Sequence, residues 1–180
     1  MSKKLAFGCG NLDFHELGYS NVDIRKFPHV DYVTDISKKL PWEDEEIDEI
    51  LAESVLEHMH HGPCTGGTSY ARAHLNTIDI LSEWRRVLKT GGKCVIKVPN
   101  ILGIINCYKT GKMQYRDFWM YLYGGQEYVE NTHLAGFDPF TLKEVMTIAG
   151  FRDVILRNCH NINEPLDEDN AWEMTAIGIK

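Results

Sequence analysis

The chain has 180 residues, of which 43% are hydrophobic and 25% are charged, so we expect a single globular domain spanning residues 1–180. Its formal net charge of −7 argues against non-specific nucleic-acid binding, which needs clusters of basic residues. No apolar run is long enough to span a bilayer, so we expect no membrane partner.

The N-terminus and the cysteines indicate a cytoplasmic location. The basic pair Lys3–Lys4 is followed so soon by Gly8 that no signal-peptide core develops. The cysteines are five in number, and no two have CxxC spacing. They are Cys9, Cys64, Cys94, Cys107 and Cys159. This usage favours reduced thiols over a disulfide framework or a zinc ribbon.

Short apolar runs bounded by turn residues predict strands in the first part of the chain. They cover residues 4–7, 21–24, 31–34 and 47–52. The acidic stretch 43–46, before the last of these strands, is typical of a solvated loop.

Helices and strands alternate in the rest of the chain. Apolar residues at helical spacing predict a helix from Leu75 to Leu88, ended by Gly91–Gly92. A strand over residues 94–98 follows. Thr141 and Glu144 have the spacing of a capping box, which predicts a helix beginning there and ending at Gly150. Final strands are expected near residues 154–157 and 175–179. This alternation favours a mostly parallel sheet, which binds ligands at the carboxyl ends of its strands.

The first strand ends in a glycine-containing turn, Gly8-Cys9-Gly10. Glycines at this point allow a sharp turn and let a ligand approach the main chain closely. An ordinary tight turn would have the same composition, so the motif is weak by itself.

Acidic residues follow the next two strands. Asp23 stands where a carboxylate could accept hydrogen bonds from the ribose hydroxyls of a nucleoside, although a turn or cap residue would look the same. Asp35 could accept a hydrogen bond from an adenine amino group, with Ile36 against the ring. Its alternative role is a helix N-cap.

Taken in order, the segments FGCGN (7–11), NVDI (21–24), TDI (34–36), DEILAESVLEH (48–58), RRVLKTGG (85–92) and VIKVPN (95–100) resemble the class I S-adenosylmethionine-dependent methyltransferases. The resemblance is strongest to the small, methyltransferase type 11-like members. It resumes at residues 140–151. It implies an α/β, Rossmann-like three-layer sandwich with a mostly parallel seven-stranded sheet, whose last strand is antiparallel. The chain begins at the first strand, so the helices that family members often place before it are not expected.

The resemblance also implies a set of cofactor-binding residues. Gly8, Cys9 and Gly10 would line the methionine part of S-adenosylmethionine, and Asp23 would hold the ribose. Asp35 and Ile36 would frame the adenine. Glu53 and Ser54, just past the fourth strand, would lie beside the methionine or sulfonium portion.

The family usually has a longer glycine loop followed by a full helix. Here only about a dozen residues separate Gly10 from Val22, too few for a crossover helix with its turns. The expected function is methyl transfer to a small-molecule or glycan-type acceptor. The short loop leaves a second function open, a non-catalytic module that binds S-adenosylmethionine or S-adenosylhomocysteine. A dinucleotide-binding protein is disfavoured, because Asp13 stands where GxGxxG has its third glycine.

Residues 101–137 form an aromatic-rich insertion after the fifth strand. Its position past a carboxyl strand end fits a lid over the substrate. Its aromatics could equally pack against the sheet or against a second copy of the chain in a homodimer. The sequence favours neither reading.

Candidates for a general base are weak, and no metal site is expected. Glu57, His58, Asp117 and His133 are the candidate bases, needed only if the acceptor must lose a proton. Histidines also cluster at positions 58, 60, 61 and 74, with Cys64 nearby. The glycines between them and the absence of HxxxH or CxxC spacing argue for a loop instead of a zinc site.

Overall fold

The computed structural model describes residues 2–61 and 75–180, which form an α/β fold around one sheet. The sheet has seven strands in the order β3-β2-β1-β4-β5-β7-β6. Their bounds are β1 (Lys4–Phe7), β2 (Ser20–Asp23), β3 (Tyr32–Val33), β4 (Ile47–Glu53), β5 (Leu88–Pro99), β6 (Arg152–Asn158) and β7 (Glu173–Ile179). Each predicted strand is present, with bounds that differ by a few residues.

The strand pairing confirms the predicted topology. Strands β1 to β5 pair in parallel, whereas β7 is antiparallel to both β5 and β6. The chain runs outward from β1 to β3 and then returns to place β4 on the other side of β1. This reversal of strand order creates the crevice in which open α/β sheets bind ligands.

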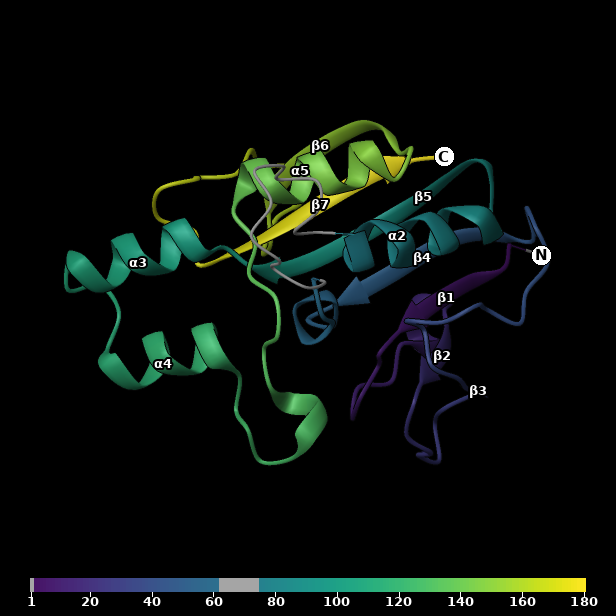
Figure 1. Cartoon of the computed structure of the whole chain (residues 1–180), viewed down its shortest axis with the longest axis horizontal. Coiled ribbons are helices and arrows are strands. Elements are labelled where there is room, and N and C mark those ends of the chain that lie inside the picture. Colours follow the sequence, from purple (N-terminus) through teal and green to yellow (C-terminus); the bar gives the residue numbers. More distant parts are fainter. Residues whose placement is uncertain (1, 62–74) are drawn as a thin grey trace.

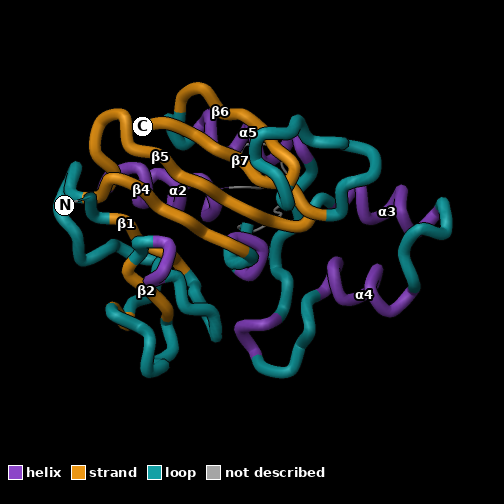
Figure 2. The backbone as a smooth tube through the Cα atoms, turned by 180° about the vertical axis from the view of Figure 1, so that it is seen from behind, coloured by secondary structure: helices purple, strands orange, loops and turns teal. Residues whose placement is uncertain are grey.

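The helices of the described residues differ in where they pack. They are α2 (Leu75–Val87), α3 (Ile101–Lys109), α4 (Tyr115–Tyr123) and α5 (Pro139–Ile148), with short 3-10 turns η1 (His15–Leu17), η2 (Leu56–His58) and η3 (Val129–Asn131). Helices α2 and α5 lie on one face of the sheet, and the view from behind shows the strands in front of them (Figures 1 and 2). Helices α3 and α4 project past the end of β4 (Figure 1).

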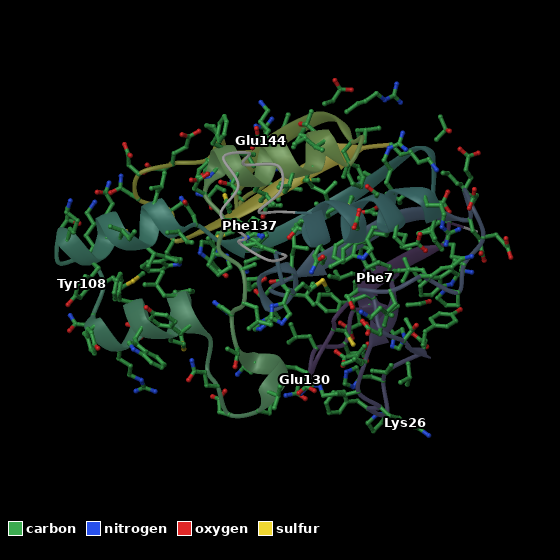
Figure 3. All side chains as sticks on the ribbon, in the orientation of Figure 1. Phe7, Lys26, Tyr108, Glu130, Phe137 and Glu144 are labelled. Atoms are coloured by element: carbon green, nitrogen blue, oxygen red, sulfur yellow. The ribbon has the colours of Figure 1, made fainter. Side chains whose placement is uncertain are left out.

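Aromatic side chains fill the core between the sheet and α2. Phe7 lies in the interior (Figure 3), and the centre of its ring is 5.2 Å from that of Trp84. Both side chains are at most 1% exposed. On the other face of the sheet, Phe14 packs with Ala6 and Cys9. The β1–β2 connection, which contains only η1, therefore covers β1 where a crossover helix would ordinarily lie, as its length predicted.

Two predicted helix boundaries were wrong. Helix α2, which was predicted to be ended by Gly91–Gly92, ends at Val87, and both glycines lie within the bounds of β5. The later helix begins at Pro139, because the Asp138 side chain accepts a hydrogen bond from the backbone N–H of Thr141 at 2.7 Å. Asp138 is thus the N-cap, and Thr141 belongs to the first turn of the helix.

Two further observations concern the described residues only. None of their helices is both long and apolar enough to cross a membrane. Cys9, Cys94, Cys107 and Cys159 are free thiols. Cys64 and His74, which belong to the histidine-rich segment of the sequence, lie outside the described residues.

Candidate active-site cavity

A cavity of about 1100 Å³ opens at the carboxyl ends of β1, β2 and β4. All of the predicted cofactor residues line it, namely Gly8, Cys9, Gly10, Asp23, Asp35, Ile36, Glu53 and Ser54. The fold thus brings together side chains that the sequence distributes over its first 54 positions.

The glycine turn after β1 needs glycine for steric reasons. Gly8 has φ +62° and Gly10 has φ +56°, in the left-handed region that disfavours other residues. A Cβ atom on Gly8 would also lie 2.2 Å from Cγ2 of Val55. The main chain at Gly8 therefore passes directly beside the segment that follows β4. The thiol of Cys9 is buried, which raises its pKa to about 11, so it is a neutral thiol.

Asp23 ends β2 as a buried carboxylate that is 4% exposed. Its Oδ2 accepts a hydrogen bond from the backbone N–H of Gly10 at 2.8 Å, and its Oδ1 accepts one from the backbone N–H of Arg25 at 2.8 Å. A carboxylate can accept about four hydrogen bonds, so Oδ2 retains capacity for a ligand. Asp23 thus both fixes the glycine turn and faces the cavity.

Asp35 and Ile36 line the cavity beyond β3. Asp35 Oδ1 accepts hydrogen bonds from the backbone N–H of Ser37 at 2.9 Å and from its hydroxyl at 2.6 Å. Asp35 therefore caps a turn, close to the alternative role of a helix N-cap. Ile36 is 7% exposed, and its carbonyl accepts a hydrogen bond from Nε1 of Trp84 at 2.9 Å. The core tryptophan thus supports the cavity wall.

Glu53 and Ser54 follow each other at the end of β4. Glu53 accepts a hydrogen bond from Nζ of Lys97 at 3.0 Å, and the same ammonium lies 3.5 Å from Glu173. Ser54 has φ +53°, which is uncommon for a residue other than glycine. Such backbone strain concentrates at functional sites.

Glu57, in η2, is the most deeply buried acidic group of the cavity wall. It is 2% exposed, and within the described residues its Oε2 has no hydrogen-bond partner. Burial raises its pKa to about 8. The Glu57 carbonyl accepts hydrogen bonds from the backbone N–H groups of Leu134 and Ala135, at 2.8 and 2.9 Å. These bonds tie η2 to the end of the aromatic insertion.

His58 and His133 are in edge-to-face contact on the cavity wall, with ring centres 4.8 Å apart. Nδ1 of His58 lies 3.1 Å from the carbonyl oxygen of Thr132, and Nδ1 of His133 lies 3.0 Å from that of Tyr121. Burial lowers the pKa of both imidazoles, that of His133 to about 4. Both rings are therefore neutral near pH 7.

The insertion supplies the opposite wall of the cavity. Tyr121, Tyr128 and His133 line it, and Figure 3 shows Glu130 on the side of the insertion that faces the β1–β3 half of the molecule. Glu57, His58 and His133 thus face the cavity. Asp117, the remaining candidate base, is exposed on α4 and is not part of the lining.

Two contacts at the cavity, made by Arg25 and by Lys97, were not foreseen from the sequence. Arg25 lies over the ring of Tyr128, and Lys97 pairs with Glu53 and Glu173. Lys97 stands in β5 at the position that pairs in register with Glu53, so a correct strand alignment would have predicted that contact. No sequence signal connects Arg25 with Tyr128.

The strand order and the cavity at the strand ends define a Rossmann-like protein. Comparisons with known proteins find the same fold in methyltransferases. A sequence model described as "Methyltransferase domain", of type 11, matches residues 9–96. A methyltransferase from Archaeoglobus fulgidus described as SAM-dependent superposes with a TM-score of 0.61 at 18% identity, covering 99% of this chain and 86% of that one. An S-adenosylmethionine-dependent methyltransferase from Mesorhizobium loti superposes with a TM-score of 0.63 at 10% identity, and the match covers 99% of this chain and 90% of that one.

A third solved structure has a ligand bound. Phosphoethanolamine N-methyltransferase 2 from Haemonchus contortus, in complex with S-adenosyl-L-methionine, gives a TM-score of 0.62 at 15% identity, covering 99% of this chain and 48% of that one. No curated protein sequence gives a significant match. The methyltransferase-domain model thus matches the part of the chain in which the sequence resembles the class I S-adenosylmethionine-dependent methyltransferases, and the solved structures share the fold that this resemblance implies.

Proposed function

We propose that this chain transfers the methyl group of S-adenosylmethionine to a small-molecule or glycan-type acceptor bound in the same cavity. The observation that carries the proposal is a single cavity of about 1100 Å³ lined on one side by the strand ends and on the other by the insertion. Sites for one small ligand measure about 300–1,000 Å³, so this cavity has room for a cofactor and an acceptor together.

Each wall of the cavity suits one part of the cofactor. Gly8, Cys9 and Gly10 would receive the methionine portion, because the absence of side chains on the two glycines leaves the main chain accessible. Asp23 would accept hydrogen bonds from the ribose through Oδ2. The remaining contacts are assigned by position in the cavity, with Asp35 and Ile36 at the adenine and Glu53 and Ser54 at the sulfonium.

The cofactor supplies an electrophilic methyl group on a good leaving group, so the protein's task is positioning and exclusion of water. The insertion would exclude water from the cavity, since its Tyr128 contacts Arg25 across the cavity. His58 and His133 are neutral imidazoles at the cavity surface. Either could accept a proton from an acceptor that must lose one.

One observation favours the second candidate function, a non-catalytic module that binds the cofactor or its demethylated product. The β1–β2 connection has only η1 in place of a crossover helix, so the cofactor half of the cavity has a shorter cover than the fold usually provides. For such a module we expect the chain to bind the cofactor without transferring its methyl group.

Calorimetry followed by a turnover assay tests both functions. We expect S-adenosylmethionine and S-adenosylhomocysteine to bind with one site per chain and NAD not to bind. Release of S-adenosylhomocysteine in the presence of a small-metabolite extract would identify an enzyme. Binding without release would favour the module, and failure of both cofactor forms to bind would refute both functions.

The insertion also supports the homodimer prediction. Tyr115, Trp119 and Tyr123 on α4 are 63%, 40% and 50% exposed. Exposed aromatic groups of this kind are enriched at protein interfaces. Sedimentation equilibrium of the wild-type chain, with a Trp119→Ser variant as the comparison, would test this.

The free thiols of the described residues support the further proposal of a reducing, cytoplasmic location.

A further inference from the structure

One carboxylate and two imidazoles converge on the wall of the cavity at the end of the aromatic insertion. One ligand atom each from Glu57, His58 and His133 can be chosen so that all lie within 4.8 Å of one another. Ligand atoms bound to one ion at about 2.0–2.2 Å lie roughly 3–3.5 Å apart, so small side-chain movements would bring these three onto a common ion.

The histidines are oriented as metal ligands usually are. In each ring Nδ1 faces a backbone carbonyl, which can only accept, so Nδ1 carries the proton. In the neutral ring the lone pair is then on Nε2. Metal-binding histidines almost always donate their second ring N–H to a carbonyl or carboxylate in this manner, which fixes the tautomer and the orientation of the ring.

The carboxylate gives an independent indication of a ligand. Glu57 is 2% exposed, and its Oε2 has no hydrogen-bond partner among the described residues although Glu57 lines the cavity. Buried polar atoms are almost always satisfied, so an orphan oxygen at a cavity calls for an absent partner such as an ion.

The main chain holds the three groups together. The carbonyl of Glu57 accepts two backbone hydrogen bonds from the insertion, and the N–H of His133 donates to the carbonyl of Tyr123 at 3.1 Å. The surrounding charge also favours a cation. Glu53 and Glu173 lie on the same cavity wall with Lys97 as their shared ammonium partner, so the acidic groups outnumber the basic one even before Glu57 is counted.

We propose that Glu57, His58 and His133 form a site for a divalent transition metal whose remaining coordination positions open into the cavity and take oxygen atoms of the acceptor. Two imidazoles and one carboxylate with open positions suit ions such as Mn²⁺, Co²⁺ or Zn²⁺. The part of this inference that concerns the acceptor rests on the proposed function, whereas metal binding does not. The two histidines would then act as ligands, not as proton acceptors.

The site differs from the histidine-rich loop considered in the sequence. In that loop the candidate metal ligands were histidines close together along the chain. Here His61, one of those neighbours, is engaged elsewhere, with Nδ1 3.0 Å from the Thr77 hydroxyl. Only the fold brings His133 to His58.

Titration of the metal-free full-length chain with Co²⁺, followed by optical absorption and calorimetry, tests the site without using activity. We expect one Co²⁺ per chain. We expect Glu57→Gln and His133→Ala each to weaken binding at least tenfold, and His15→Ala, an exposed histidine outside the cavity, to bind Co²⁺ like wild type. Circular dichroism shows whether each variant is folded, and Glu57→Gln, nearly isosteric, guards against misfolding of the alanine variant.

Two results would overturn the metal site. One is no stoichiometric binding by the wild-type chain. The other is wild-type binding by both folded ligand variants, with loss of binding in Cys159→Ser, which would place the ion at the second cluster of Cys159, His160 and Glu173. S-adenosylmethionine binding, measured separately, would show whether the proposed function stands in either case.

Acetohydroxamate, a bidentate oxygen donor, tests the open coordination positions. We expect it to change the absorption spectrum of the Co²⁺-loaded chain, because it would occupy the positions assigned to the acceptor. An unchanged spectrum at saturating acetohydroxamate would refute the role of the ion in acceptor binding while leaving the metal site intact.

Discussion

The guanidinium carbon of Arg25 lies 4.5 Å from the centre of the Tyr128 ring, and this contact joins the strand-end side of the cavity to the aromatic insertion. Arg25 follows β2, and Tyr128 lies just before η3. A cation over an aromatic face contributes about 0.5–2 kcal/mol. This contact therefore stabilises the insertion over the cavity.

Removal of the Tyr128 ring should loosen the insertion. We expect Tyr128→Ala to increase hydrogen exchange of residues 126–134 about twofold to thirtyfold, the range that corresponds to that energy. Tyr128→Phe keeps the aromatic face and should remain closer to wild type. Mass spectrometry of exchanged peptides gives the readout. Equal protection in the alanine variant and wild type would show that the contact does not hold the insertion.

Loss of the Asp23 carboxylate should weaken cofactor binding. We expect Asp23→Ala to cost about 1.5–3 kcal/mol, the range for hydrogen bonds to a charged group, or roughly 10- to 150-fold in the dissociation constant of S-adenosylhomocysteine. Glu16→Ala, which removes an exposed carboxylate from η1, is the matched control. Calorimetry measures both variants. Unchanged affinity in Asp23→Ala would remove this residue from the ribose site.

Trp84 connects the core to the cavity through Ile36. Trp84→Phe keeps most of the packing against Phe7 but removes the Nε1 donor, leaving the buried carbonyl of Ile36 without that partner. We expect a loss of about 1–3 kcal/mol of unfolding free energy. Trp119→Phe, on the exposed side of α4, should change it by less than about 0.5 kcal/mol. Urea denaturation compares the two, and equal effects would contradict a structural role for the Ile36 bond.

Glu49 should make stability depend on pH in the acidic range. Burial opposes its ionisation, but the Tyr19 hydroxyl at 2.5 Å and the ammonium groups of Lys4 and Lys93 outweigh burial and lower its pKa from the ordinary glutamate value. Since the folded-state pKa is the lower one, this stabilisation is present above the ordinary glutamate pKa and is lost as the pH falls through the folded-state pKa.

The measurement for Glu49 is the unfolding free energy of wild type and Glu49→Gln between pH 7 and pH 3. The stability advantage of wild type should be largest near neutrality and should shrink on acidification. Glu16→Gln, which alters an exposed carboxylate on η1, is the matched control. An advantage that stayed constant or grew at low pH would contradict the lowered pKa.

Local sequence features predicted the strands and the grouping of the residues that line the strand-end side of the cavity, because those residues directly follow strands whose carboxyl ends must meet. Gly8, Asp23 and Glu53 illustrate this. Contacts that depend on the path of the insertion could not be predicted. The pairing of His58 with His133 requires knowledge of where residues 101–137 fold back, and nothing in the local composition of that insertion specifies it.

Boundary errors have a similar physical origin. Thr141 and Glu144 have the spacing of a capping box, yet Asp138 caps the helix because it precedes Pro139, a residue favoured in the first turn. Gly91 does have a positive φ, as expected of a helix-ending glycine, but that conformation occurs within the bounds of β5. Tertiary pairing with β4 extends the strand into a region that propensity alone assigns to the helix end.

A crystal structure of the chain with S-adenosylhomocysteine tests the central claim most directly. We predict density for one ligand in the cavity, with the ribose hydroxyls within hydrogen-bond distance of Asp23 and the sulfur nearest Glu53 and Ser54. Ligand density outside this cavity, or in it with the ribose away from Asp23, would contradict the account.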